Sequence, residues 1–187
     1  GNYSYNFYQY NVETAVWSEL APAPIYSGNN GGATFLDGKI YTTYTSNSTL
    51  GIYDIATNTW ETQSLPISTG NITTDGEYLY LVGSTLYRYD VVLNESVELS
   101  SPIIAFEPWG GLEYFDGYLY GHVGNGLTGF QRYDIANDSW EELARVPSGA
   151  VLGAAIDPVA RRYHTYGNYE GTSWYSYDID NNEWSIT

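Results

Sequence analysis

The sequence predicts an all-β fold, a β-propeller built from four-stranded antiparallel blades. A Tyr-Asp pair, an aliphatic residue and a Trp seven positions after the Tyr recur along the chain. Asp-Gly pairs between short apolar or aromatic segments separate the copies, and no stretch has the pattern of a long helix. Four short strands in each of several repeats, arranged radially, are typical of propeller blades.

The Tyr-to-Trp motif marks the third and fourth strands of each repeat. The copies run from Tyr10 to Trp17, Tyr53 to Trp60, Tyr133 to Trp140 and Tyr177 to Trp184, with a degenerate copy from Tyr89 to Val97. Successive tyrosines are 43, 36, 44 and 44 positions apart, which is the spacing of a repeat architecture. We expect these aromatic residues to fill the space between blades.

The first and second strands of each repeat flank a tight turn. The turns are Asp37-Gly38, Asp75-Gly76 and Asp116-Gly117, with Asp157-Pro158 in the equivalent place of the last repeat. Asp-Gly favours the positive φ angles of a type I′ turn, so each pair predicts a two-residue hairpin. The strand before the turn is small and led by glycine, and the strand after it is rich in tyrosine.

Aspartates also recur in the turns between third and fourth strands, at Asp54, Asp90, Asp134 and Asp178. Residues that repeat with the scaffold usually serve it. We therefore expect these carboxylates to accept hydrogen bonds from nearby backbone amides rather than to catalyse.

The pattern Asp37-Gly38-Lys39-Ile40-Tyr41, followed by Tyr53-Asp54 and Thr57-Asn58-x-Trp60, resembles the Kelch family of β-propellers. The resemblance is best over residues 31–66 and weaker elsewhere. The double glycine that usually closes the second Kelch strand is missing, and Gly-Gly pairs instead precede the first strand at Gly31 and Gly110. The chain is thus expected to be one divergent Kelch-like domain or segment, with units 1–24, 25–66, 67–102, 103–147 and 148–187.

The first unit, residues 1–24, holds only the third and fourth strands of a blade. The last unit already has its own third and fourth strands, so the two ends do not complete one blade between them. Three explanations remain open: a segment of a larger propeller or surface protein, a small ring with a two-stranded blade, or pairing of the exposed edge with another copy of the chain.

Composition excludes several classes of function. The chain has no cysteine, which excludes thiol chemistry, disulfides and Cys-ligated zinc. Its 6 basic against 22 acidic residues give a net charge of −16, which argues against a nucleic-acid partner. No apolar run is long enough to span a bilayer. The scarcity of lysine and five Asn-x-Ser/Thr sequons favour an extracellular or cell-surface location, with candidate glycans at Asn2, Asn47, Asn71, Asn94 and Asn137.

The two histidines, His122 and His164, are expected to point to opposite faces of their strands, because glycine alignment places them two and three residues before Gly124 and Gly167. We therefore expect no metal site and no cofactor.

Binding residues are sought where the repeats differ, in the second-to-third and fourth-to-first strand loops, which share one face in such propellers. The candidates on this loop face are Tyr26, Asn29, Asn30, Glu107, Trp109, Asn125, Tyr169 and Glu170. Aromatic, amide and acidic groups together suit a glycan or protein partner.

The leading hypothesis is a non-enzymatic extracellular binding or structural propeller module. It belongs to a larger surface protein or self-associates through the half-blade edge. The alternative is a carbohydrate-active enzyme, a sugar epimerase or glycan hydrolase that uses loop carboxylates and tyrosines. No catalytic motif is recognisable.

Overall fold

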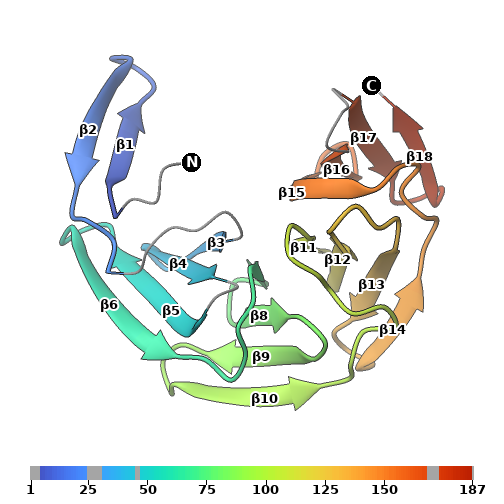
Figure 1. Cartoon of the computed structure of the whole chain (residues 1–187), viewed down its shortest axis with the longest axis horizontal. Helices are drawn as coiled ribbons and strands as arrows, with labels where there is room; N and C mark the ends of the chain where they lie inside the picture. The colour runs from blue at the N-terminus through green and yellow to red at the C-terminus, as the bar shows by residue number, and fades with distance from the viewer. Residues whose placement is uncertain (1–4, 25–30, 45–46, 168–172, 187) are drawn as a thin grey trace.

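A computed structural model describes residues 5–24, 31–44, 47–167 and 173–186. The helices and strands among these residues are all β-strands, arranged in five antiparallel sheets that follow an open arc (Figure 1). One sheet has two strands and four have four strands in meander order. The predicted all-β propeller arrangement, with an N-terminal half-blade, is confirmed.

The half-blade pairs β1 (Phe7–Asn11) with β2 (Val16–Leu20). Blade 1 contains β3 (Gly31–Leu36), β4 (Lys39–Tyr44), β5 (Asn47–Asp54) and β6 (Thr59–Ser64). Blade 2 contains β7 (Asn71–Thr74), β8 (Leu79–Val82), β9 (Leu86–Asp90) and β10 (Glu95–Leu99). Blade 3 contains β11 (Gly111–Phe115), β12 (Tyr118–His122), β13 (Phe130–Asp134) and β14 (Ser139–Glu142). Blade 4 contains β15 (Ala150–Asp157), β16 (Arg162–Gly167), β17 (Ser173–Asp178) and β18 (Glu183–Ile186).

The first strand of each blade lies nearest the centre of the arc, and the fourth lies on the rim (Figure 1). Neighbouring first strands contact one another from β3 through β7 and β11 to β15. Glycine permits this approach: a Cβ added at Gly111 would lie 2.6 Å from the Cβ of Ala154 on the next blade. The central strands therefore pack almost backbone to backbone.

Two of the three Asp-Gly turns have the predicted geometry. Both residues have positive φ at Asp37-Gly38 (47° and 76°) and at Asp116-Gly117 (53° and 84°). The prediction is wrong at Asp75, where only Gly76 has positive φ (97°) and four residues separate β7 from β8. The carboxylate of Asp75 accepts the amides of residues 77 and 78 at 2.9 and 2.8 Å, a local bonding pattern that replaces the two-residue turn.

The turn aspartates between third and fourth strands bond backbone amides, as predicted. Asp90 accepts the amides of residues 92 and 93, both at 2.9 Å, and Asp134 accepts those of residues 136 and 137 at 3.0 and 3.1 Å. Asp178 does the same for residues 180 and 181, and Asp54 accepts the amide of Thr57 at 3.0 Å. Such bonds lower the pKa of Asp54, and the bond from the Thr57 amide is the largest cause of this lowering.

Aromatic side chains fill the space between blades, as predicted. The ring of Phe130 on blade 3 lies 4.7 to 5.0 Å from the rings of Tyr163, Tyr177 and Trp184 on blade 4. Phe7 of the half-blade lies in the same way against blade 1, 4.8 Å from Tyr53 and 5.2 Å from Trp60. In each contact one aromatic residue of a sheet thus packs against the Tyr and the Trp of the sheet that follows it in the chain.

A repeated backbone contact, here called the latch, joins sheets at the rim. The backbone amide of a residue just after the fourth strand donates to the side chain of an Asn or Asp of the next blade. The carbonyl oxygen of the same residue accepts the indole N–H of that blade's Trp, and both bonds are 2.7 to 2.9 Å long. The three latches are Ala21 with Asn58 and Trp60, Ser100 with Asp138 and Trp140, and Ala144 with Asn182 and Trp184. Blade 2 has Val97 in the Trp position, and there the hydroxyl of Tyr89 reaches Gln63 of blade 1 instead, at 2.6 Å.

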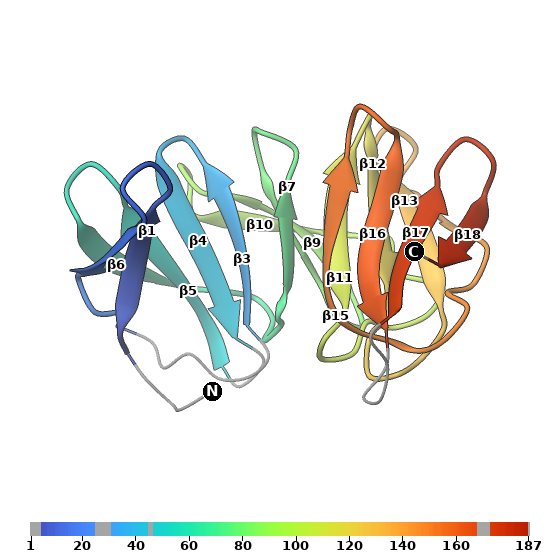
Figure 2. The ribbon, with the colours of Figure 1, turned by 90° about the horizontal axis from the view of Figure 1, so that it is seen from above.

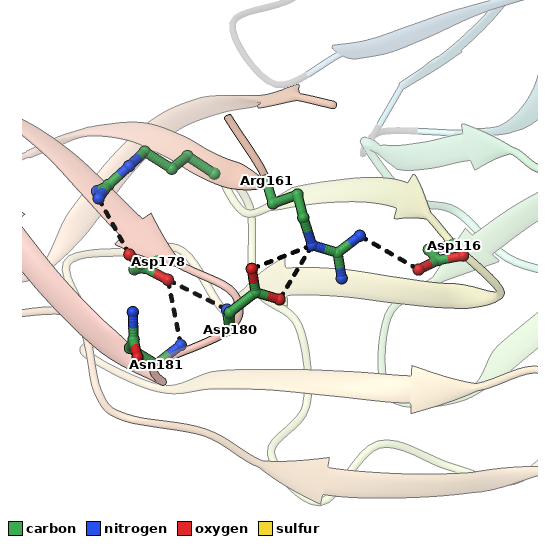
Figure 3. A network of polar contacts seen from close by, with 6 residues as sticks. Asp116, Arg161, Asp178, Asp180 and Asn181 are labelled. Atoms are coloured by element: carbon green, nitrogen blue, oxygen red, sulfur yellow. Dashed lines mark hydrogen bonds and ion pairs between the residues drawn. The ribbon is translucent and has the colours of Figure 1, made fainter. Parts of the chain in front are cut away.

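The first-to-second and third-to-fourth strand turns lie on one side of the molecule (Figure 2). An exposed ion-pair network joins blades 3 and 4 on this side (Figure 3). Arg161 lies between Asp116 of blade 3, at 3.4 Å, and Asp180 of blade 4, at 3.0 Å. Exposed pairs contribute little to stability individually, so the aromatic contacts and latches carry most of the cohesion between blades.

Candidate functional site

A cavity of about 280 Å³ lies at the centre of the arc, where the first strands of all four blades meet. Glycine dominates its walls, and the absence of side chains there leaves the space open. The lining residues are Gly31, Gly32, Ala33, Gly70, Asn71, Ile72, Trp109, Gly110, Gly111, Leu112, Glu113, Gly153 and Ala154.

Glu113 of β11 is the one acidic side chain among the described residues that line this cavity. Because side chains alternate along a strand, Glu113 and Gly111 point to the same side, toward blade 4. Burial raises the pKa of the Glu113 carboxyl group to about 7. Within the described part of the chain, no hydrogen bond or ion pair compensates this desolvation.

Trp109 lies at the cavity with a φ of 64°, in the left-handed region that bulky residues rarely adopt. Two loops hold its neighbours in place through the backbone. The amide of Asn125 donates to the carbonyl of Pro108 at 3.0 Å, and the amide of Gly110 donates to that of Glu107 at 3.3 Å. Strained backbone of this kind persists only where its surroundings fix it, and it concentrates at binding sites.

Three of the sequence-predicted loop-face residues thus lie close together, Glu107, Trp109 and Asn125, and of these Trp109 lines the cavity. The other five, Tyr26, Asn29, Asn30, Tyr169 and Glu170, fall outside the described residues. Sequence reasoning missed Glu113. The signal that could have found it is a charged residue within a Gly-led first strand, where the other repeats have small, apolar or uncharged residues.

Asn71 was a candidate for glycosylation, but its side chain lies at the cavity. It is only 4% exposed, and its amide nitrogen donates to the carbonyls of Glu107 at 3.3 Å and Val82 at 3.5 Å. This burial leaves no room for a glycan in the folded chain. Asn47, Asn94 and Asn137 remain predictions, and Asn2 falls outside the described residues.

The two histidines face the same way within their blades, which corrects the expectation of opposite faces. His122 pairs with Phe130, and Tyr166 is the equivalent residue of blade 4 because it pairs with Trp174. His164 is two residues from Tyr166 and therefore points to the same side. The glycine alignment failed because Gly124 belongs to the loop after β12, whereas Gly167 is the last residue of β16.

Blade 4 nevertheless separates the two imidazoles. His122 is fully buried between blades 3 and 4, with Nδ1 at 2.7 Å from the hydroxyl of Tyr163. Burial lowers the pKa of His122 to about 4, against the opposing effect of the Trp109 backbone. In the described residues, no three His, Cys, Asp or Glu side chains gather in a way that could hold a metal ion. The same residues contain no helix that is long and apolar enough to cross a membrane.

At the two ends of the arc, side chains are exposed at positions of the repeat that are buried in the other blades. Tyr10 is 42% exposed, whereas its equivalents Tyr53, Tyr133 and Tyr177 are at most 3% exposed. We call the exposed surface around Tyr10 and Trp17 the N-terminal end face.

The C-terminal end face surrounds Trp174, which is 55% exposed although its equivalent Phe130 is fully buried. Trp174 packs edge-on against Tyr166 with ring centroids 5.4 Å apart. Both rings border a cavity of about 480 Å³ that also includes His164 and Ala154. Its walls are almost entirely apolar, like the interior faces between blades.

No protein-family model matches the chain, and no curated protein matches it in sequence. Solved structures do match it, 670 chains in all. Hydrazine synthase of Kuenenia stuttgartiensis superposes with a TM-score of 0.67 at 14% sequence identity, over 96% of this chain and 53% of that chain. The chain thus spans about half the length of the hydrazine synthase chain. At this identity the likeness shows the fold alone, and it supports the propeller arrangement.

Proposed function

We propose that the chain is a Kelch-type propeller module of an extracellular surface protein, that it acts by binding, and that further blades of the same repeat cover its end faces. The observation that carries the proposal is the exposure of Tyr10 and Trp174 at positions that are buried in the other blades. Large aromatic side chains that are exposed together at positions otherwise buried are typical of an interaction surface.

The two end faces are complementary halves of the contact that joins the blades. Between blades 3 and 4, Phe130 inserts against Tyr177 and Trp184. Trp174 presents the inserting residue at one end of the arc, and Tyr10 with Trp17 presents the receiving pair at the other. A blade of the same repeat would satisfy both faces, because it carries one half of the contact on each side.

The inner edge of β1 supports the same conclusion. In blade 3, β13 pairs with strands on both sides, whereas β1 pairs only with β2 among the described residues. A strand with unpaired N–H and C=O groups is a template for strand addition. Self-association of two copies of the chain through this edge would use the same N–H and C=O groups of β1. Exchange and sedimentation measurements distinguish self-association from completion by further blades.

The experiment appends a second copy of residues 144–187 after Thr187, which continues the 44-residue repeat in register. We expect the added Tyr and Trp to cover Trp174 and to slow amide exchange in β17 by tenfold or more, because a tenfold change corresponds to only about 1.4 kcal/mol. The matched control carries Tyr177→Ser and Trp184→Ser in the added copy alone.

Unchanged exchange in β17 of the extended chain would refute the proposed completion by further blades. Concentration-dependent sedimentation of the original chain, abolished by Trp17→Ser, would instead favour self-association. Kelch membership and an extracellular location rest on the repeat motif, the scarcity of lysine and the sequons at Asn47, Asn94 and Asn137.

The loop face is the proposed ligand face, for a protein or glycan partner, since Trp109 and the central cavity open there. Within the alternative of a carbohydrate-active enzyme, a sugar epimerase or glycan hydrolase, the hydrolase needs two carboxylates about 5 to 10 Å apart. Glu113 is the single acidic side chain among the described cavity residues, so the geometry supports binding better than hydrolysis.

A further inference from the structure

We infer that the central cavity binds a small organic cation, an ammonium or guanidinium group, with Glu113 as its counter-ion. This inference deepens the loop-face part of the proposed function and does not depend on the end faces. It names the chemical class of ligand that the cavity can hold.

The electrostatics of the cavity favour a cation. Glu113 is half-buried and has no compensating partner among the described residues, and a partly desolvated carboxylate is stabilised by an opposite charge placed beside it. No lysine, arginine or histidine lines the described cavity. With a net charge of −16, the field of the whole chain also attracts cations.

The arginines of the chain are occupied elsewhere, so none can neutralise Glu113. The ion pairs are Arg132 with Glu141, Arg145 with Glu142, Arg161 with Asp180 and Arg162 with Asp178, at 2.6 to 3.0 Å. Arg88 lies over the ring of Tyr78, 4.5 Å from its centroid. Lys39, the one lysine, acts on the carboxylate of Asp54. The basic side chains therefore leave Glu113 without a partner, and a ligand can supply the positive charge.

The other polar groups of the cavity offer acceptors. Asn71 uses its amide nitrogen to donate to two backbone carbonyls, which turns its Oδ1 toward Gly110 and the cavity. A Cβ added at Gly110 would lie 2.7 Å from this oxygen, so glycine keeps the approach to it open. A ligand that carries several N–H donors can bond to Glu113 and Asn71 together.

Trp109 is the one aromatic residue among the described residues that line the same cavity. The face of an indole ring attracts cations, by about 0.5 to 2 kcal/mol depending on how far the pair is desolvated. The positive φ of Trp109 shows that the backbone holds this residue in an unfavourable conformation at the cavity. A carboxylate, an amide oxygen and an aromatic ring around one space are the groups that recognise organic cations.

Binding should depend on the ionisation of Glu113 alone between pH 6 and pH 8. The titratable groups that face it from the packed strands are Tyr163 of β16 and Tyr120 and His122 of β12, whereas His164, next to Tyr163, points to the opposite side of blade 4. Burial raises the pKa of both tyrosines and lowers that of His122, so all three are neutral in this range. β3, β7 and β15 contribute no titratable side chain to the described cavity.

The experiment measures binding of methylguanidinium and of its neutral isostere N-methylurea by calorimetry at pH 8 and pH 6. We expect methylguanidinium to bind at pH 8 and about tenfold more weakly at pH 6, because a pKa of about 7 leaves roughly a tenth of Glu113 ionised there. N-methylurea should not bind at either pH.

Glu113→Gln should abolish binding of methylguanidinium, and Glu95→Gln, at an exposed carboxylate of the rim strand β10, should leave it unchanged. Trp109→Gly is the second variant, since glycine accepts the positive φ while the ring is lost, and it should weaken binding several-fold. The inference is overturned if methylguanidinium fails to bind the intact chain at pH 8 or binds Glu113→Gln equally well. Equal binding of N-methylurea would also overturn it, while leaving a loop-face binding role in place.

Discussion

Glu113 and His122 lie on neighbouring strands, and burial shifts their pKa values in opposite directions. The unfolded chain takes up a proton at His122 near pH 6.5, whereas the folded chain does so only near pH 4, so stability is lost as the pH falls through this window. The folded chain keeps a proton on Glu113 up to about pH 7, whereas the unfolded chain releases it near pH 4.5, so stability is lost as the pH rises. The two groups therefore offset one another.

We expect Glu113→Gln to uncover the effect of His122. In this variant the free energy of unfolding should fall by about 3 kcal/mol from pH 7 to pH 4, because burial lowers the pKa of His122 from 6.5 to about 4 and Glu113 no longer opposes the effect. The parent chain should change less, with Glu113 offsetting somewhat under 3 kcal/mol since its site is partly open to solvent. Urea unfolding at a series of pH values measures both chains.

Glu107→Gln is the matched control and should follow the parent chain. The aspartates with lowered pKa, such as Asp54 and Asp178, lose most of their contribution below about pH 4 and do so alike in all three chains. If the stability of the Glu113→Gln chain depended on pH as little as that of its parent, Glu113 and His122 would not be the groups whose effects offset one another.

The sequence predicts single residues well where one short segment decides their environment. The turn aspartates bond amides two and three residues ahead, so their role follows from local sequence. Glu113 and His122 depend on which blade packs against them and on the register of β11 with β12. That information comes from contacts between repeats, and no local pattern contains it.

At the scale of elements, the latch couples the rim of one blade to the next. Asn182 accepts both the amide of Ala144 and the hydroxyl of Tyr177, each at 2.8 Å, and has a φ of 54°. Asn58 and Asp138 occupy the same place in two other blades, with similar positive φ. The half-blade has Ala15 there, also at positive φ (55°) but without a side-chain acceptor.

Asn182→Gly should lower the free energy of unfolding by about 1 to 3 kcal/mol, because it leaves two donors without their acceptor while glycine keeps the backbone angle. Asn182→Ala should cost roughly 1 kcal/mol more, from strain at positive φ. Denaturant unfolding measures both. Ala15→Gly is the control and should cause no loss, since no latch exists there; equal losses at both sites would attribute the effect to glycine rather than to the latch.

Strand order and most turns of each blade could be predicted from the sequence, because the Tyr, Trp and Asp-Gly positions recur. The errors arose where one repeat departs from the others. At Asp75, side-chain bonds to the backbone support a longer loop than the Asp-Gly pair implies. At His122, the loop after β12 displaced the glycine that served as the alignment mark.

For the whole molecule, the half-blade and the count of blades could be predicted, but the state of the end faces could not. The repeat shows that residues 1–24 carry two strands of a blade, and the structure confirms a two-stranded sheet there. Whether Tyr10 is buried depends on what lies beyond β1, and no repeat inside the chain supplies that neighbour. The exposure of Tyr10 and Trp174 could be established only from the arrangement of the blades.

The open arc predicts a gradient of local stability along the chain. Blades 2 and 3 each share buried clusters with a neighbour on both sides, blade 4 shares one only with blade 3, and the half-blade has an exposed strand pair. In repeat architectures, stability is close to a sum of unit terms and interface terms, so units with one interface open first.

Amide hydrogen exchange should therefore be fastest in β1 and β2, intermediate in β15–β18 and slowest in β7–β14. Phe7→Ser, which removes the aromatic contact of the half-blade with Tyr53 and Trp60, should speed exchange in β1 and β2 further and leave blade 3 unchanged. Measurement at two protein concentrations separates the single chain from any assembly. Equal protection of β1 and β9 in the dilute sample would contradict the gradient, because it would require the N-terminal end face to be covered within one chain.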